Sequence, residues 1–261
     1  GGGTPTTLEP EQLDRLITAL KSKFDFSTVK EFTVEAGRAD SITREKLQVL
    51  LDHGIDRISI NPQTMNQKTL DLIGRRHTVE NVKEKFHIAR ELGFDNINMD
   101  LIVGLPGEDT DSVENTLRQV KELSPESLTV HTLAIKRAAN LNIEMDKYRD
   151  TLKSDIDSQL GAVTRAAAEM GLDPYYLYRQ KNMTGNLENV GYSKPGLECL
   201  YNILIMEEKQ SIVALGAGAA CKCVSDHGLT VTRCENVKDV GLYIERIDEM
   251  IERKRELFSE R

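Results

Sequence analysis

The chain has 261 residues, a formal net charge of −8 and 39% hydrophobic residues, enough for one large α/β domain or two smaller ones with a core. Its acidic balance excludes nucleic acid and anionic membrane surfaces as general partners. No stretch has the roughly 18 apolar residues of a membrane span, so we expect a protein that lies outside the membrane.

The four cysteines do not form the dense pattern of a disulfide framework, and no signal peptide precedes them. Both features predict a reducing, cytoplasmic setting. The chain begins with glycine instead of methionine, so we expect it to be part of a longer protein. The cysteines are expected to be small buried or surface thiols: Cys199, Cys221, Cys223 and Cys234.

The N-terminal residues 1–7 read GGGTPTT, which indicates either a flexible leader or a loop whose bare backbone approaches a ligand. An amphipathic helix is expected to begin at Pro10. A short strand over 32–35 then ends on an acid, Glu35.

A helix followed by a strand occurs twice in succession. Thr43 is expected to cap a helix that stops at Gly54, and Thr78 a helix that stops at Gly93, with a strand after each glycine. A fainter third copy precedes an aromatic strand at 175–178. Alternation of helices and strands predicts an α/β fold with a parallel sheet and right-handed crossovers, either an open sheet or a barrel.

The segment 96–107, NINMDLIVGLPG, is the strongest strand signal in the chain. Its apolar residues predict a strand buried on both faces of a parallel sheet. Asp100 interrupts it, and a buried carboxylate needs a partner. Two partners are open: the backbone N–H groups of the following turn, or a ligand.

Polar residues stand at or near the carboxyl ends of successive expected strands, where α/β proteins place their ligands. They are Glu35, Gln63, Asp100 and His131. Several such residues in register predict one site.

Beyond residue 136 the alternation of helix and strand patterns is weaker. We expect helices over 145–170 and 195–209, an aromatic strand over 175–179, and a strand over 211–220 that leads into Gly216-Ala217-Gly218. A dinucleotide fingerprint would need glycine where Cys221 stands, so a Rossmann site is rejected. The segments 179–182 and 186–192 are polar and are expected either to cover a substrate or to be solvated loops.

A charged terminal helix is expected to pack on the outside of the barrel. Its apolar stripe consists of Val240, Ile244, Ile247 and Ile251.

The succession GGGTPT, TVEA, RISINPQT, IGRRH and NINMDLIVGLPGE resembles the radical S-adenosylmethionine (SAM) enzymes of the oxygen-independent coproporphyrinogen III oxidase family. GRRHTVE and NLENVGY are similar to its coproporphyrinogen dehydrogenase branch. The resemblance implies a partial (β/α)6 radical-SAM-type barrel over residues 1–136, completed and extended by an α/β segment over 137–261.

The resemblance also implies a SAM site. Gly2, Gly3 and Thr4 match the glycine motif that receives the methionine amino group, and Glu35 matches a further SAM contact. Gln63 and Asp100 match the side chains that bind ribose hydroxyls. Arg75 matches the arginine that pairs with the methionine carboxylate, and Ala134 a small residue against the cofactor. The chain departs from many relatives at Gly37-Arg38, where they have Asn-Pro or Asp-Pro.

The family's [4Fe–4S] cluster is held by C-x3-C-x2-C, which lies N-terminal to GGGTP and is missing here. Cys221-Lys222-Cys223 is too short to replace it, so we expect no metal ligands in this chain and no activity from it alone. The resemblance implies that the full-length enzyme receives electrons from a donor and oxidatively decarboxylates coproporphyrinogen III in anaerobic haem biosynthesis.

Two rival functions stay open. A haem-transfer protein shares this barrel, and decarboxylated vinyl product would exclude it. A non-radical barrel that binds a phosphorylated metabolite is opposed by Glu35 and Asp100, because both would repel phosphate.

Overall fold

The computed structural model describes residues 3–133, 156–178, 189–225 and 228–259. The chain divides into two compact units, Thr4–Glu198 and Cys199–Arg261, the second of which includes residues 1–3. The sequence-based boundary at 136/137 lies outside the described residues and stays a prediction. No helix in the described part is both long and apolar enough to cross a bilayer.

The Thr4–Glu198 unit is built on a six-stranded sheet with the order β1-β2-β3-β4-β6-β5. The four strands β1 to β4 pair in parallel, as the sequence predicts, and β6 pairs antiparallel with both β4 and β5. The strands are β1 (Thr33–Gly37), β2 (Arg57–Ile60), β3 (Ile97–Val103), β4 (Ser127–Thr132), β5 (Asp173–Tyr178) and β6 (Asn189–Ser193).

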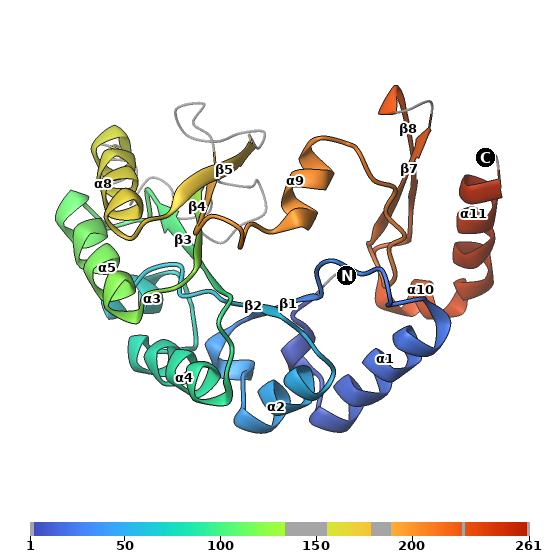
Figure 1. Cartoon of the computed structure of the whole chain (residues 1–261), viewed down its shortest axis with the longest axis horizontal. Coiled ribbons are helices and arrows are strands. Elements are labelled where there is room, and N and C mark those ends of the chain that lie inside the picture. Colours follow the sequence, from blue (N-terminus) through green and yellow to red (C-terminus); the bar gives the residue numbers. More distant parts are fainter. Residues whose placement is uncertain (1–2, 134–155, 179–188, 226–227, 260–261) are drawn as a thin grey trace. The chain divides into compact units, whose positions relative to one another are not determined.

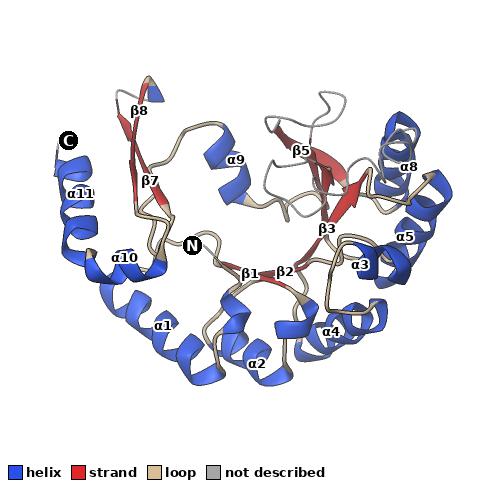
Figure 2. Ribbon diagram, turned by 180° about the vertical axis from the view of Figure 1, so that it is seen from behind, coloured by secondary structure: helices blue, strands red, loops and turns tan. Residues whose placement is uncertain are grey.

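Helices follow the parallel strands and cover the outer side of the curved sheet (Figures 1 and 2). Thr43 and Thr78 cap α2 and α4 as predicted, and Gly93 ends α4 with a left-handed backbone. The helices of this unit are α1 (Pro10–Lys23), α2 (Arg44–Asp52), α3 (Gln67–Leu72), α4 (Val79–Leu92), α5 (Thr110–Leu123) and α8 (Ile156–Glu169), with 3-10 turns η1 (Pro5–Thr7) and η2 (Ala39–Ser41).

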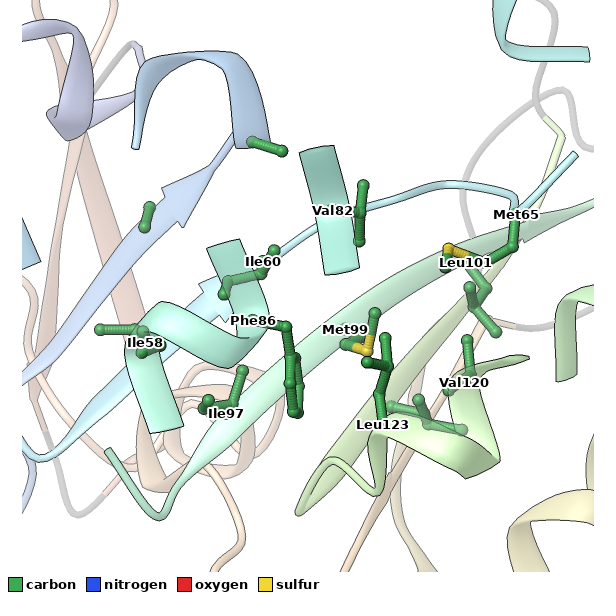
Figure 3. Packing of buried hydrophobic residues seen from close by; sticks show 14 of the residues in the cluster. Ile58, Ile60, Met65, Val82, Phe86, Ile97, Met99, Leu101, Val120 and Leu123 are labelled. Atoms are coloured by element: carbon green, nitrogen blue, oxygen red, sulfur yellow. The ribbon is translucent and has the colours of Figure 1, made fainter. Parts of the chain in front are cut away.

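The hydrophobic core lies between this sheet and its helices (Figure 3). Alternate residues of each strand face the core, so burial removes their apolar side chains from water while the other face of the sheet is free to be polar. In Figure 3 the labelled core residues are Ile58, Ile60, Met65, Val82, Phe86, Ile97, Met99, Leu101, Val120 and Leu123.

The prediction that the strand after Asn96 is buried on both faces holds only for its first residues. Ile97, Asn98 and Met99 are all buried, whereas Asp100 and Ile102, farther along, are only half-buried. The inner face of the sheet is therefore accessible at the carboxyl end of β3.

The Cys199–Arg261 unit contains an antiparallel hairpin of β7 (Ala220–Ser225) and β8 (Thr230–Glu235), with α9 (Leu200–Met206), α10 (Val240–Glu245) and α11 (Ile247–Ser259). Three of its four thiols, Cys199, Cys221 and Cys223, are buried.

Several sequence-based expectations for the C-terminal half need correction. The expected strand at 211–220 is reduced to one bridge between Ile212 and Lys222, and the strand begins at Ala220. The expected loop at 186–192 is strand β6 from Asn189 onward. The terminal helix is two helices, and its apolar stripe is exposed within the described unit: Val240 64%, Ile244 68%, Ile247 38% and Ile251 41%.

Candidate functional site

Polar side chains line the inner face of the sheet, because they alternate with the core residues of the same strands. The register places Ser59 opposite Asn98, and Asp100 opposite Thr129. The inward row consists of Glu35 on β1, Arg57 and Ser59 on β2, Asn98 and Asp100 on β3, and Ser127, Thr129 and His131 on β4.

Asp100 has one engaged and one open carboxylate oxygen. Asn98 Nδ2 donates to Asp100 Oδ1 at 2.7 Å, and Thr129 Oγ1 donates to Asn98 Oδ1 at 3.2 Å, which orients that amide. Asp100 Oδ2 accepts no hydrogen bond within the described residues and lies 3.8 Å from His131 Nε2. The turn N–H groups do not bind this acid, so its second oxygen is available to a donor from outside the chain.

Glu35 lies near Asp100 on the same face. Its side chain is exposed to solvent in part, but surrounding protein displaces some of its water. This desolvation raises the pKa of Glu35, and the negative charge of Asp100 raises it further. A hydrogen bond with Ser59 and the charge of Arg57 act in the opposite direction. The two acids together favour hydroxyl or ammonium donors and disfavour anions.

Gln63 reaches the same place through its backbone. Its N–H donates to Asp100 O at 3.0 Å, and its carbonyl accepts from Ile102 N at 2.8 Å. Gln63 holds a left-handed conformation with φ 69°, which costs a non-glycine residue roughly 1–2 kcal/mol. The loop after β2 is thus fixed beside the carboxyl end of β3.

Arg75 lies in a separate, cationic part of the site, beside Arg38 and Asp40. Arg38 forms a two-bond ion pair with Asp40, with Nη2 to Oδ2 at 2.6 Å, whereas Arg75 makes no ion pair with any acid in the described ranges. Burial, and secondarily the charge of Arg38, lower the pKa of Arg75, and Asp40 opposes them. A half-buried guanidinium without a carboxylate partner suits a carboxylate ligand.

The turn η1 places Thr4 beside the end of β1. A Cβ at Gly37 would lie 3.7 Å from Thr4 Cγ2. Thr6, fully buried, donates from Oγ1 to Ala36 O at 2.7 Å, and Lys46 Nζ donates to Thr6 O at 2.8 Å. These bonds fix the turn that contains Thr4 against β1.

The structure therefore brings together Glu35, Gln63 and Asp100, and places Thr4 and Arg75 at the carboxyl end of β1, beside Gly37 and Arg38. Gly3 falls in the other compact unit. Gly2 and Ala134 lie outside the described residues.

Sequence reasoning missed Ser59 and Asn98, which bond to the two acids, and Tyr178, which bonds to His131. Tyr178 donates to or accepts from His131 Nδ1 at 3.0 Å, and its ring meets the imidazole edge-on. Alternation with the core residues of the same strands could have indicated Ser59 and Asn98. Nothing in the spacing could have paired Tyr178 with His131, because β6 lies between their strands.

Carboxylates, a guanidinium and a threonine turn suit a ligand that carries hydroxyls, an ammonium and a carboxylate. They do not suit an iron–sulfur cluster. Within the described ranges no three His, Cys, Asp or Glu side chains converge as metal ligands, and the sequence contains no C-x3-C-x2-C.

Residues 1–120 match the radical SAM superfamily model. The chain is 48% identical over 255 residues to the oxygen-independent coproporphyrinogen-III oxidase-like protein HemZ of Bacillus subtilis, covering 97% of this chain and 51% of the relative. It is 32% identical over 256 residues to the heme chaperone HemW of the same organism, covering 95% and 61%. The chain thus spans about half the length of the curated relatives it matches.

The fold also resembles a solved structure, coproporphyrinogen III oxidase (HemN) from Escherichia coli, with a TM-score of 0.70 and 23% identity. The likeness covers 95% of this chain and 56% of that one. The parallel strands and their helices therefore follow the radical SAM fold, as the sequence predicts.

Proposed function

Because this chain belongs to the radical SAM superfamily and resembles its oxygen-independent coproporphyrinogen III oxidase-like members, we propose that it forms the SAM-binding part of an enzyme that oxidatively decarboxylates coproporphyrinogen III to protoporphyrinogen IX. The similarity to the coproporphyrinogen-III oxidase-like protein HemZ, of whose length the chain spans about half, supports this substrate.

The accessible carboxylate of Asp100 supports the proposal most. Its free Oδ2 accepts a ribose hydroxyl, and Gln63 contributes a second contact beside it. Arg75 pairs with the methionine carboxylate, for which its fork geometry is suited. Thr4 and Glu35 receive the methionine amino group and the adjacent part of SAM.

SAM, when bound, supplies the hydrogen-abstracting chemistry of the family. The residues of this chain bind and orient it: the two acids accept hydrogen bonds from its donors, and the guanidinium of Arg75 binds its carboxylate. The cluster does not fit the residues of this chain, so its ligands are assigned to other parts of the full-length protein, together with the docking of an electron donor.

A second function is favoured by a specific finding. Heme chaperones match nearly the whole chain, at 30% identity over 84% of it in Lactococcus lactis and 32% over 95% in Bacillus subtilis. A haem-transfer protein of this kind would bind haem tightly and leave coproporphyrinogen III unchanged.

Anaerobic incubation of the full-length protein with SAM, a reductant and coproporphyrinogen III tests the proposal. We expect conversion of two propionate side chains to vinyl groups, detected by mass spectrometry. Unchanged coproporphyrinogen III with tight haem binding would replace the proposal by haem transfer. Binding of a phosphorylated metabolite without SAM binding would overturn both.

A further inference from the structure

His131 on β4 is fixed from the side of β5. The Tyr178 hydroxyl lies 3.0 Å from His131 Nδ1, and the two rings meet edge-on with centroids 6.2 Å apart. Both side chains lie on the inner face, on strands that flank β6. Tyr178 therefore holds the imidazole in one orientation.

This contact leaves the second ring nitrogen for another partner. When the Tyr178 hydroxyl donates to Nδ1, the neutral imidazole carries its hydrogen on Nε2. His131 Nε2 faces Asp100 Oδ2 at 3.8 Å, which is too long for a direct hydrogen bond. The other oxygen of Asp100 is already engaged by Asn98 at 2.7 Å. In this tautomer a donor and an acceptor thus lie 3.8 Å apart without a direct bond between them.

A hydroxyl group matches this pair of atoms chemically. Its oxygen can lie about 2.8 Å from both atoms, donating to Asp100 Oδ2 and accepting from His131 Nε2–H. A carboxylate or phosphate cannot donate to Asp100, and an ammonium cannot accept from His131. The pair therefore distinguishes a hydroxyl from the other polar groups of a ligand.

We propose that His131, oriented by Tyr178, is a ligand-binding residue that binds one ribose hydroxyl of SAM jointly with Asp100. The inference rests on the proposed SAM site and adds to it a residue that sets specificity for the ribose. Asp100 alone would accept from any donor, whereas the pair requires a group that both donates and accepts.

Two substitutions of His131 separate this role from a structural one. In His131→Gln the side-chain amide nitrogen lies near the position of Nε2, so the donor to the hydroxyl is kept. In His131→Asn it lies near Nδ1, so the contact with Tyr178 is kept and the donor toward Asp100 is lost. The full-length protein, prepared anaerobically, is titrated calorimetrically with SAM, 2′-deoxy-SAM and 3′-deoxy-SAM.

We expect His131→Asn to weaken SAM binding about 2- to 10-fold, the range of one net hydrogen bond, and His131→Gln to stay within about twofold of wild type. For the deoxy compound that lacks the hydroxyl bound by His131 and Asp100, His131→Asn and wild type should have the same affinity. Tyr178→Phe should weaken SAM binding in the same direction, because it frees the ring.

Equal affinities for SAM in wild type and His131→Asn, with Asp100 still required, would overturn the role of His131 and leave the SAM site standing. A loss in His131→Asn that is the same for all three compounds would show a structural effect and also overturn it. No binding of SAM to the wild-type protein would instead overturn the proposed function itself.

Discussion

Gly191 on β6 allows the ring of Tyr176 on β5 to lie directly on the backbone of its neighbour, and replacing it with alanine should destabilise the protein. The two residues are register partners. A Cβ at Gly191 would lie 1.9 Å from Tyr176 Cε1 and 2.3 Å from Cδ1, far inside van der Waals contact. Neighbouring rings restrict its movement, because Tyr178 stacks on it with ring centroids 6.0 Å apart and the tilted ring of Tyr175 lies 4.8 Å away.

Forcing a methyl group into such packing costs about 1–3 kcal/mol. Alanine also lowers the conformational entropy of the unfolded chain, which stabilises the folded protein by about 0.4–1 kcal/mol and offsets part of this cost. The expected net loss is therefore about 1–2 kcal/mol, with a fall in Tm of roughly 2–4 °C per kcal/mol for a protein of this size.

Urea denaturation of wild type and Gly191→Ala measures the loss. Gly161→Ala is the matched control, because its Cβ would meet only Arg165 Nη1 at 3.5 Å inside α8, and should raise stability by about 0.5–1 kcal/mol. In the double variant with Tyr176→Ala, the Gly191→Ala cost should largely disappear. A Gly191→Ala protein as stable as wild type would refute the reasoning.

Three further predictions follow from charged groups. Because the pKa of Glu35 is raised in the folded protein, ionisation of this carboxyl disfavours folding, and wild type loses stability as pH rises above about 4.5. Glu35→Gln should therefore have a higher Tm than wild type at pH 7 and the same Tm below about pH 4.5. Identical Tm profiles of the two proteins against pH would contradict this. Arg75→Lys keeps the charge but loses the planar guanidinium that can donate two parallel hydrogen bonds to a carboxylate, so SAM affinity should fall about tenfold. Arg76→Lys, at an exposed position, should leave SAM affinity unchanged. Glu126→Gln should cost about 1–3 kcal/mol in urea denaturation, because its buried carboxylate accepts from Arg90 at 2.7 and 2.8 Å. Glu169→Gln, at the exposed pair with Lys121, should change the urea midpoint far less.

Local signals predicted the N-terminal half of the fold well. Thr43 and Thr78 cap helices through their own side chains, and the glycines behind those helices take left-handed backbones, so short sequence patterns determine these elements. The parallel order of β1 to β4 follows from helices of regular length between them.

The C-terminal half was less predictable because its strands depend on distant partners. Asn189–Ser193 looks like a polar loop, yet it lies between β4 and β5 as an antiparallel strand, and its Gly191 is explained only by the Tyr176 ring. The hairpin strand at Ala220 is likewise set by pairing with β8 instead of by its own apolar pattern.

The site shows the same division. Strand-end position identified Glu35, Gln63 and Asp100 from the residues alone, because parallel strands bring their carboxyl ends to one edge. Asn98 lies two residues before Asp100 on the same strand, so strand alternation could have indicated it. Tyr178 reaches His131 from a strand that is not adjacent, and a single sequence carries no signal for such a pair.

The SAM site is tested most directly by calorimetric titration of SAM into the full-length protein and its Asp100→Asn variant. Asp100→Asn removes a charge-assisted bond worth roughly 1.5–3 kcal/mol, so affinity should fall about tenfold or more. Asp95→Asn makes the same change at an exposed acid before β3 and should bind like wild type. An Asp100→Asn protein that melts like wild type and binds SAM with unchanged affinity would contradict the assignment of this site.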